Sequence, residues 1–367
     1  MLTSRHVLRL EDAARSLDVS DASIHLVVTS PPYPMIEMWD ESFVDQDPGI
    51  GDALTKGDGE TAFRAMHELL DPVWRECERL LHPGGFLCVN IGDATRSLSD
   101  MFRLYANHAA LLERLTGLGF VSLPAIIWRK PTNAPTKFMG SGTLPAGAYV
   151  TLEHEYILVM RKGGRRRFSE DERSRRRRSA MFWEERNHWY SDVWELRGTR
   201  QALADMEARK RSAAFPFELP YRLINMFSVQ EDWVLDPFAG TGTTMAAAAA
   251  SGRNSIGIER SSALEPAVSD TMERAAGLGR ERATERLEAH ARFIEEYRRE
   301  RGHTFKHWND VHRTPVMSGQ ETDLTIPTVR ELRKIDAGIW EASQVQARRE
   351  AQGELFSASG DVFRGGG

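Results

Sequence analysis

Short apolar runs rich in β-branched residues alternate along this chain with longer stretches in which apolar residues recur at helical spacing. The apolar runs predict buried strands at 24–28, 86–92, 121–130, 154–162, 233–236 and 254–259. The periodic stretches predict helices at 61–81, about 100–117, 216–227, from 245 onward and at 281–300. Residues 35–60 are acidic and contain several glycines, and we expect them to form a surface insertion.

This alternation predicts an α/β fold, in which helices cover both faces of a mostly parallel sheet. Ligands in such folds bind at the carboxyl ends of the strands. Two of the predicted strand ends carry unusual chemistry, namely Thr29 to Tyr33 and Asp236 to Thr244. We therefore expect a functional site where these two segments meet.

The composition narrows the class of protein. The chain has 367 residues, 41% of them hydrophobic, which suffices for one large domain with insertions or for two modest ones. Its formal net charge of -5 means that any nucleic-acid surface must be a local patch. Cys77 and Cys88 form no Cys-x-x-Cys pair, and no uncharged apolar run approaches about 18 residues. We expect a cytoplasmic protein with no metal site, no disulfide framework and no membrane contact.

The segment from Asp236 to Thr244 (DPFAGTGTT) has the chemistry of a ligand loop. Its glycines let a ligand approach backbone N–H groups at a helix N-terminus, yet it matches neither a phosphate-binding loop nor a dinucleotide pattern. A carboxylate at a strand end suits an ammonium group, and a helix N-terminus suits a carboxylate. S-adenosylmethionine carries both groups, and Glu259 at the next strand end can accept hydrogen bonds from its ribose hydroxyls. The alternative is a tight turn that holds no ligand.

The tetrapeptide Ser30-Pro31-Pro32-Tyr33 has the chemistry needed to hold an amine. Its paired prolines fix the directions of the Ser30 hydroxyl and the Pro31 carbonyl, and both can accept hydrogen bonds from an exocyclic NH₂. Two such acceptors favour a pyramidal nitrogen whose lone pair can attack a sulfonium methyl in line. The Tyr33 ring can stack on an extruded base. The alternative is a proline-rich strand end without a catalytic role.

Together the two motifs resemble the amino-methylating DNA methyltransferases. The tetrapeptide precedes the glycine loop by about 200 residues, as in the circularly permuted β class, and the resemblance covers roughly residues 20–262. It implies a Rossmann-like, permuted methyltransferase sheet that binds S-adenosyl-L-methionine. The segment Ala213-Ala214-Phe215-Pro216-Phe217 occupies the position of a family pattern that covers the cofactor. The cofactor-binding residues expected on these grounds are Asp236, Phe238, Gly240, Thr241, Gly242, Thr243, Glu259, Phe215 and Pro216.

The first residue of the tetrapeptide bears on the target base. Family members that methylate cytosine N4 typically have Ser there, and those that methylate adenine N6 typically have Asp or Asn, so Ser30 favours N4-cytosine with N6-adenine as the alternative. Enzymes that methylate RNA or a protein glutamine usually carry the motifs in the other order. A further alternative is a DNA-binding module that keeps the cofactor fold without its activity. This alternative is disfavoured because the motif residues are intact, namely Ser30, Tyr33, Asp236 and Glu259.

A basic segment is the strongest local departure from the acidic net charge. Residues 161–178 contain ten Arg or Lys and three acids, a local net charge of +7. Such a stretch is typical of phosphate contacts, although a solvated arginine loop is the alternative. The predicted DNA-contacting residues are Arg165, Arg166, Arg167, Arg175, Arg176, Arg177 and Arg178, with Lys137 in the 131–150 loop as a second candidate.

These observations predict a catalytic domain over residues 1–262 and a helical and mixed C-terminal extension over 263–367. The catalytic domain would comprise a catalytic half at about 20–162, a basic insertion at 163–190 that takes part in target recognition, and a cofactor half at about 210–262. The expected partner is double-stranded DNA. Whether a cognate restriction endonuclease exists stays open at this point.

Overall fold

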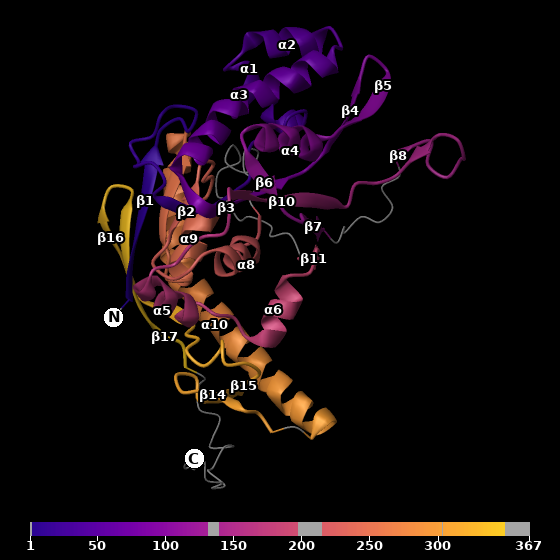
Figure 1. The fold of residues 1–367 in the computed structure, drawn as a ribbon. Coiled ribbons are helices and arrows are strands. Elements are labelled where there is room, and N and C mark those ends of the chain that lie inside the picture. Colours follow the sequence, from indigo (N-terminus) through magenta and orange to yellow (C-terminus); the bar gives the residue numbers. More distant parts are fainter. Residues whose placement is uncertain (1, 131–138, 197–214, 303, 349–367) are drawn as a thin grey trace, which may run out of the picture.

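One large mixed sheet organises the chain (Figure 1). The computed structural model describes residues 2–130, 139–196, 215–302 and 304–348. Within these ranges the sheet contains the strands β1 (Leu2–Leu10), β2 (Ile24–Thr29), β3 (Leu81–Ile91), β6 (Phe120–Ser122), β7 (Ile126–Arg129), β10 (His154–Lys162), β11 (Val193–Glu195), β12 (Trp233–Asp236), β13 (Asn254–Glu259), β16 (Pro327–Asp336) and β17 (Ile339–Gln346). Their order is β11-β7-β10-β3-β2-β12-β13-β1-β17-β16, and β6 pairs with β10.

The centre of the sheet is parallel and joins segments that are far apart in the sequence. Strands β3, β2, β12, β13 and β1 pair in parallel, whereas β10 runs antiparallel to β3 and β17 runs antiparallel to β1. Val27 of β2 lies opposite Leu235 of β12, so these two strands end side by side. The predicted permuted, Rossmann-like α/β fold is confirmed, with antiparallel strands toward both edges.

Helices cover both faces of the sheet, as predicted. They are α3 (Gly59–Leu80), α4 (Asn107–Gly117), α8 (Glu218–Phe227), α9 (Thr243–Ala250) and α10 (Glu265–Arg301). The alternation along β2 shows the two layers, because Val27 packs into the cluster with α3 and α4 while Leu26 and Val28 pack with α8 and α9. The alanines of α9 are buried, and their small side chains let this helix lie close to the strands.

Three predicted elements differ from the structure. Residues 35–60 form η1 (Glu37–Trp39), α1 (Asp40–Val44) and α2 (Pro48–Thr55), and they bury Phe43 and Ile50 in the core instead of making a surface insertion. The predicted helix at 100–117 begins only at Asn107, because β4 (Ala94–Leu98) and β5 (Met101–Tyr105) form a hairpin. The predicted strand at 121–130 is two strands, β6 and β7, on either side of Pro124, whose ring and missing N–H interrupt a ladder.

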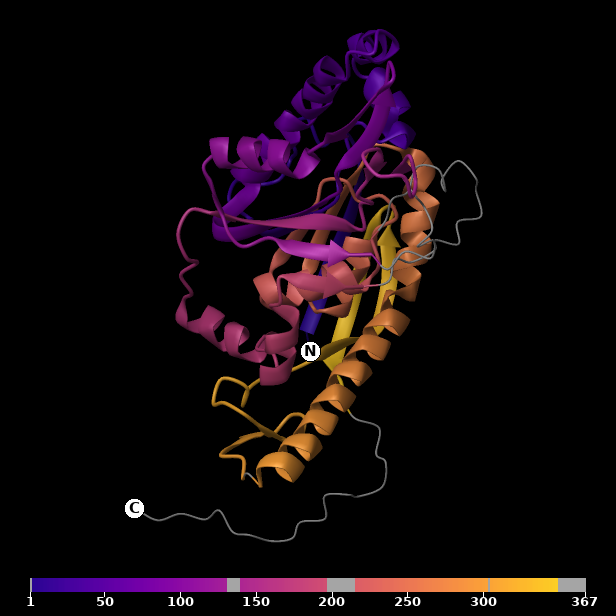
Figure 2. The same cartoon turned by 90° about the vertical axis from the view of Figure 1, so that its right-hand side faces the viewer.

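The ends of the described chain also join this architecture. Strand β1 was not predicted, and part of the predicted C-terminal extension completes the sheet, since Thr3 of β1 lies opposite Ser343 of β17. Figure 2 shows the long helix α10 running beside β16 and β17. It begins 16 residues before the helix expected from residue 281. None of the described helices is both long and apolar enough to cross a bilayer.

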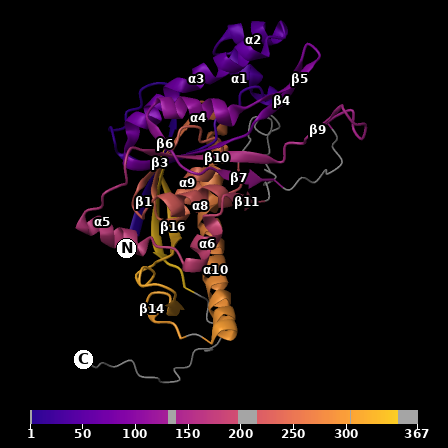
Figure 3. The ribbon, with the colours of Figure 1, turned by 45° about the vertical axis from the view of Figure 1, so that its right-hand side comes forward.

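The remaining elements are short and lie around the sheet. They are β8 (Met139–Gly140), β9 (Ala148–Tyr149), α5 (Glu170–Arg178), α6 (Trp183–Trp189), η2 (Ser262–Leu264), β14 (His307–Asn309) and β15 (Thr314–Val316). Figures 1 and 3 show the β4–β5 hairpin and the β8–β9 hairpin projecting on the same side of the molecule. Phe102 of the first stacks on Tyr149 of the second, with ring centroids 4.6 Å apart.

Candidate active site

The two sequence motifs meet at the carboxyl ends of β2 and β12. Thr29 is the last residue of β2 and Asp236 is the last residue of β12. The Thr29 Oγ1 hydroxyl donates a 2.6 Å hydrogen bond to Asp236 Oδ1. Adjacent parallel strands therefore bring together segments that are about 200 residues apart in the sequence, as the sequence predicted.

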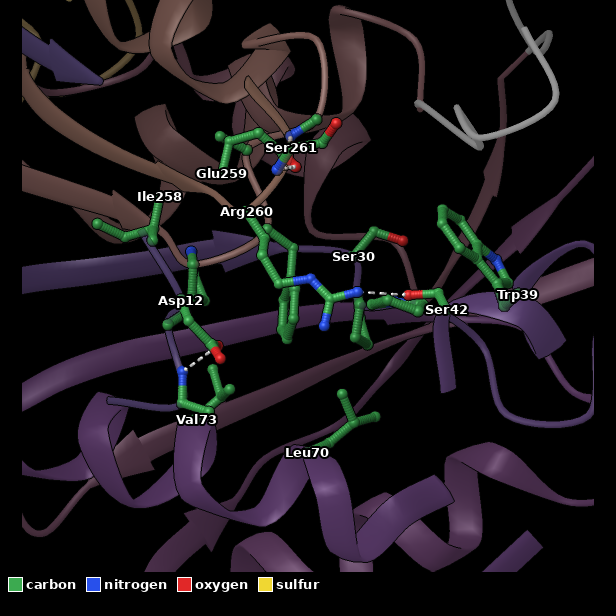
Figure 4. A pocket seen from close by; sticks show the side chains of 18 of the residues that line it. Asp12, Ser30, Trp39, Ser42, Leu70, Val73, Ile258, Glu259, Arg260 and Ser261 are labelled. Carbon is green, nitrogen blue, oxygen red and sulfur yellow. Dashed lines mark hydrogen bonds between the residues drawn. The ribbon is translucent and has the colours of Figure 1, made fainter. Parts of the chain in front are cut away.

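A cavity of about 220 Å³ opens beside these strand ends. Ser30, Pro31 and Pro32 line one part of it, and Leu70 and Val73 of α3 line another. Figure 4 shows Glu259 and Ser261 across the cavity from the α3 side chains, with Ser30 between them and Trp39. The predicted cofactor residues that line it are Asp236, Phe238, Gly240, Thr241, Thr243, Glu259 and Phe215.

Asp236 is a buried carboxylate without a cationic partner among the described residues. Its exposed fraction is 2%, and its Oδ1 accepts hydrogen bonds from Thr29 and from the Phe238 backbone N–H at 3.1 Å. Burial raises the pKa of Asp236 to about 6, and the hydrogen bond from Thr29 opposes part of that rise. An uncompensated carboxylate beside a cavity is suited to a ligand that carries a positive charge.

The glycine loop is shaped by backbone conformations that favour glycine. Gly240 and Gly242 have φ of 53° and 79°, and Gly242 is the N-cap of α9. The two Glu259 oxygens accept hydrogen bonds from the N–H groups of Gly240 at 2.9 Å and Ser261 at 2.8 Å. Burial raises the pKa of the Glu259 carboxyl. Glu259 thus holds the loop while one side of its carboxylate faces the cavity.

Gly242 and Pro216 are predicted cofactor residues that stand beside the cavity and do not line it. A Cβ on Gly242 would lie 2.8 Å from a methyl group of Val268, so this glycine allows a close helix contact. Pro216 is buried next to Phe215 at the start of α8. Ala213 and Ala214 of the family pattern lie outside the described residues.

The segment that we expected to be a surface insertion forms one wall of the cavity. Met38, Trp39 and Ser42 all line it, and the Arg260 guanidinium donates a 3.1 Å hydrogen bond to Ser42 Oγ (Figure 4). Asp12, after β1, lines it as well. These residues were not predicted, because acidic, glycine-bearing stretches are typical of loops anywhere on a surface.

Tyr33 is placed differently from its three neighbours. Its exposed fraction is only 7%, and it lies behind Ser30 in place of lining the cavity. Its hydroxyl oxygen is 3.0 Å from Ser30 Oγ and accepts a 2.7 Å hydrogen bond from Asn90 Nδ2. The hydroxyl also donates to Glu155 Oε2 at 3.0 Å. Burial and the Glu155 carboxylate raise the pKa of Tyr33 well above its usual value.

Asn90 and Glu155 were missed by the sequence analysis, although a signal was present. Asn90 is the only strongly polar residue in the apolar run FLCVNIG, and Glu155 is the second residue of the strand HEYILVMRK. A buried polar side chain at a strand end usually has a specific partner. Here Asn90 donates a hydrogen bond to the Tyr33 hydroxyl, and Glu155 accepts one from it. Asn90 Nδ2 also donates to Glu155 Oε2 at 2.7 Å.

The basic segment lies at the opposite, N-terminal edge of the central strands. Arg166 makes a bidentate pair with Asp232, which directly precedes β12, at 2.7 and 3.1 Å, and it also contacts Glu172 at 3.0 Å. Figure 1 shows α5 beside the lower ends of the strands, whereas α1 and α2 lie above the sheet. The Arg166 guanidinium is thus paired with the buried Asp232 and the partly exposed Glu172, so a DNA contact by Arg166 stays a prediction that this pairing does not favour.

The other predicted DNA-contacting arginines differ in exposure. Arg175 and Arg178 approach Glu231 at 3.4 and 3.7 Å, and Arg177 approaches Asp323 at 3.9 Å. The Arg176 guanidinium lies 4.8 Å from the centre of the Phe168 ring. Arg165 and Arg167 are exposed, and Lys137 lies outside the described residues. Phosphate contacts by this segment stay a prediction, and its position does not favour contact with DNA that enters the cavity.

Comparisons with known proteins agree with this geometry. A family model for N6/N4 DNA methylases matches residues 24–268. Type II methyltransferase M.MthZI of Methanothermobacter thermautotrophicus is 45% identical over 359 residues, which is 96% of this chain and 99% of that protein. Type II methyltransferase M.MjaI of Methanocaldococcus jannaschii is 46% identical over 280 residues, 73% of this chain and 91% of that protein.

A solved structure is also similar. It is TTHA0409, a candidate DNA modification methylase from Thermus thermophilus, in complex with S-adenosyl-L-methionine. The likeness has a TM-score of 0.57 at 33% sequence identity, and it covers 74% of this chain and 94% of that one.

Proposed function

The chain belongs to the N6/N4 DNA methylase family and uses S-adenosyl-L-methionine, and on that premise we propose that it methylates the N4 amine of cytosine in duplex DNA. Ser30 is the observation that carries the choice of base. It is the first residue of the tetrapeptide, where the family's N4-cytosine enzymes typically have Ser, and it lines the cavity beside Pro31. N6-adenine is the alternative, because the two amines present the same NH₂ geometry.

The residues around the cavity fit the cofactor. Asp236 offers an uncompensated buried carboxylate for the ammonium group of the methionine part, and Glu259 offers acceptors for the ribose hydroxyls. Thr241 and Thr243 add hydroxyl groups at the N-terminus of α9, where a carboxylate is favoured. When bound, the cofactor supplies an electrophilic methyl group on a sulfonium.

The tetrapeptide would hold the amine of a base that has been turned out of the duplex. The Ser30 hydroxyl and the Pro31 carbonyl would accept the two N–H groups of the target amine, which leaves the nitrogen lone pair for the transfer. The proline pair keeps these acceptors in place, so little reorganisation is needed during the reaction. The buried Tyr33 supports this loop from behind.

The family relatives also suggest a setting for the reaction. M.MthZI and M.MjaI are named type II methyltransferases, and the match covers almost the whole of each. We therefore propose that this chain belongs to a type II restriction-modification system in the cytoplasm. A partner endonuclease remains a prediction of this proposal.

Product identification tests the proposed function. Duplex DNA is incubated with the protein and labelled S-adenosyl-L-methionine, digested to nucleosides and analysed by mass spectrometry. N4-methylcytosine is the expected product, and N6-methyladenine would overturn the assignment of the base. Tyr33→Ala serves as the control and should lose most of the transfer while cofactor titration shows that the cavity persists. Cofactor binding by the wild type without any transfer would favour the DNA-binding module.

A further inference from the structure

A hydrogen-bond chain leads from the cavity into the sheet. Ser30 Oγ lies 3.0 Å from the Tyr33 hydroxyl, which lies 3.0 Å from Glu155 Oε2. Asn90 Nδ2 bridges the last two groups, at 2.7 Å from each. Of these four residues only Ser30 lines the cavity, and the other three connect to the cavity through it.

The chemistry of a carboxylate fixes the direction of every bond in this chain. An ionised carboxylate accepts hydrogen bonds and donates none, so Asn90 must present its NH₂ group and Tyr33 its O–H to Glu155. The one hydroxyl proton of Tyr33 is thereby committed. The 3.0 Å contact between Ser30 and Tyr33 must then be a hydrogen bond donated by Ser30. Its lone pairs are left to face the cavity.

We propose that Glu155 is a positioning residue that keeps the Ser30 hydroxyl a hydrogen-bond acceptor for the target amine. A free serine hydroxyl can rotate and either donate or accept. If it donated toward the amine, it would compete for the nitrogen lone pair that attacks the methyl group. The chain from Glu155 removes that orientation before the base arrives. This inference rests on the proposed function of Ser30 as a ligand of the amine.

The surroundings hold the Glu155 carboxylate in place. Its second oxygen, Oε1, receives a hydrogen bond from the Lys130 ammonium group, and that group lies 4.4 Å from the centre of the Trp128 ring. Glu155 pairs with Trp128 across β10 and β7, so both partners of Lys130 belong to the same two strands. The Glu155 side chain is 14% exposed. The anchor of the chain is therefore part of the rigid sheet.

The ring of Tyr33 is fixed as firmly as its hydroxyl. A Cβ on Gly92 would lie 2.9 Å from Tyr33 Cε2, so the glycine makes room for the ring. Asn107 Nδ2 donates to the carbonyls of Pro34 at 3.0 Å and Gly92 at 2.9 Å, which ties together the segments on both sides of the ring. The hydroxyl that links Ser30 to Glu155 thus has little freedom to move.

A double-mutant cycle between Ser30 and Glu155 tests the proposal, because the two side chains communicate through Tyr33. Glu155→Gln keeps the shape but can turn an NH₂ group toward Tyr33, which would reverse the chain. We expect Glu155→Gln to slow single-turnover methyl transfer by about tenfold to a hundredfold, the range for one misdirected hydrogen bond. In a Ser30→Ala background the same substitution should slow transfer by less than about threefold, since no hydroxyl remains to be oriented.

Four further measurements separate positioning from a structural role. The affinity for S-adenosyl-L-methionine and the thermal midpoint should be nearly the same for Glu155→Gln and the wild type. Tyr33→Phe keeps the ring and breaks the chain, so it should slow transfer by about as much as Glu155→Gln. Glu153→Gln, two residues earlier in the same segment at a more exposed position, is the matched control and should leave the rate unchanged.

The outcomes distinguish this inference from the proposed function. Absence of transfer by the wild type would refute the proposed function. With an active wild type, the positioning role is overturned if the losses from Ser30→Ala and Glu155→Gln multiply in the double variant. A Glu155→Gln rate near that of the wild type would overturn it too. If Glu155→Gln does not fold, Tyr33→Phe and its combination with Ser30→Ala give the same cycle.

Discussion

The two ends of β12 carry buried aspartates in opposite electrostatic settings. Asp232, just before the strand, has an exposed fraction of 1%, and Asp236, at its end, has one of 2%. Asp232 is paired with Arg166 and lies 3.7 Å from His25, whereas Asp236 has hydrogen bonds but no cation among the described residues. A buried charge lowers the stability of the fold unless a group of opposite charge is paired with it. The unmatched end of the strand is therefore the end that suits a positively charged ligand.

The largest effect, a loss of stability, should come from removing the cation that pairs with Asp232. Arg166→Met removes the partner of Asp232 and leaves a buried carboxylate without its bidentate cation. We expect the free energy of unfolding to fall by about 3–5 kcal/mol. Urea unfolding followed by circular dichroism measures it, and cofactor affinity of the folded protein should hardly change. Arg167→Met, one residue away and exposed, is the control and should cost less than about 0.5 kcal/mol.

A substitution of Asp236, at the unmatched end, should change cofactor binding without lowering stability. Asp236→Asn removes the charge and keeps the shape, so calorimetry should find S-adenosyl-L-methionine binding weaker by about 1.5–3 kcal/mol. The thermal midpoint of the ligand-free protein should not fall, because an amide costs less to bury than an unpaired carboxylate. Asp232→Asn is the matched comparison and should show the reverse pattern. Unchanged cofactor affinity in Asp236→Asn would contradict the assignment of the ammonium site.

The raised pKa of Asp236 predicts how cofactor binding depends on pH. Its pKa is about 6, so the carboxylate is mostly ionised at pH 7 and mostly protonated at pH 5. Only the ionised form attracts an ammonium group, and we therefore expect about tenfold weaker binding at pH 5 than at pH 7. The raised pKa of Glu259 also favours weaker cofactor binding at low pH. Titrations of Asp236→Asn should be markedly flatter over this range, and an equally steep curve would assign the effect elsewhere.

The smallest effect, on the salt dependence of DNA binding, should come from replacing the exposed arginines near Asp232. Replacing Arg165, Arg167, Arg176 and Arg177 by Gln should change the slope of DNA affinity against salt concentration by less than about one, because the segment lies at the far edge of the sheet from the cavity. Fluorescence anisotropy over a salt series measures this slope. If all four contacted phosphates, the slope would fall by about 3.6, and the DNA would have to reach that edge.

The comparison also explains which parts of the molecule could be predicted. The strand ends at Thr29 and Asp236 were found because apolar runs that stop at proline or glycine have a plain periodic signature. The role of the arginine run was harder to predict, because a sequence shows the charge of Arg166 but not the buried Asp232 that neutralises it. The density of positive charge led to an arginine that pairs with a buried aspartate, whereas the polar residues at the strand ends led to the cavity.

Two missed elements have specific physical reasons. The inward residues of β1 include Ser4 and His6, which hydrogen-bond to each other at 3.0 Å, so the expected alternation of apolar residues is hidden. The β4–β5 hairpin lies in a stretch with helical spacing. Its turn is made by Ser99 and Asp100 with φ of 47° and 63°, a conformation that short polar side chains tolerate. Glu155 and Asn90 were missed because their partner, Tyr33, is distant in sequence.

The pairing of β1 with β17 bears on how the chain folds during synthesis. Thr3 meets Ser343, so the outer neighbour of β1 emerges from the ribosome only after nearly all of the rest of the sheet. Until then β1 presents a row of unpaired backbone groups that can pair with another nascent chain. Contacts of such long sequence separation also slow folding. Shortened chains that stop before β17 are consequently the form of this protein most exposed to aggregation.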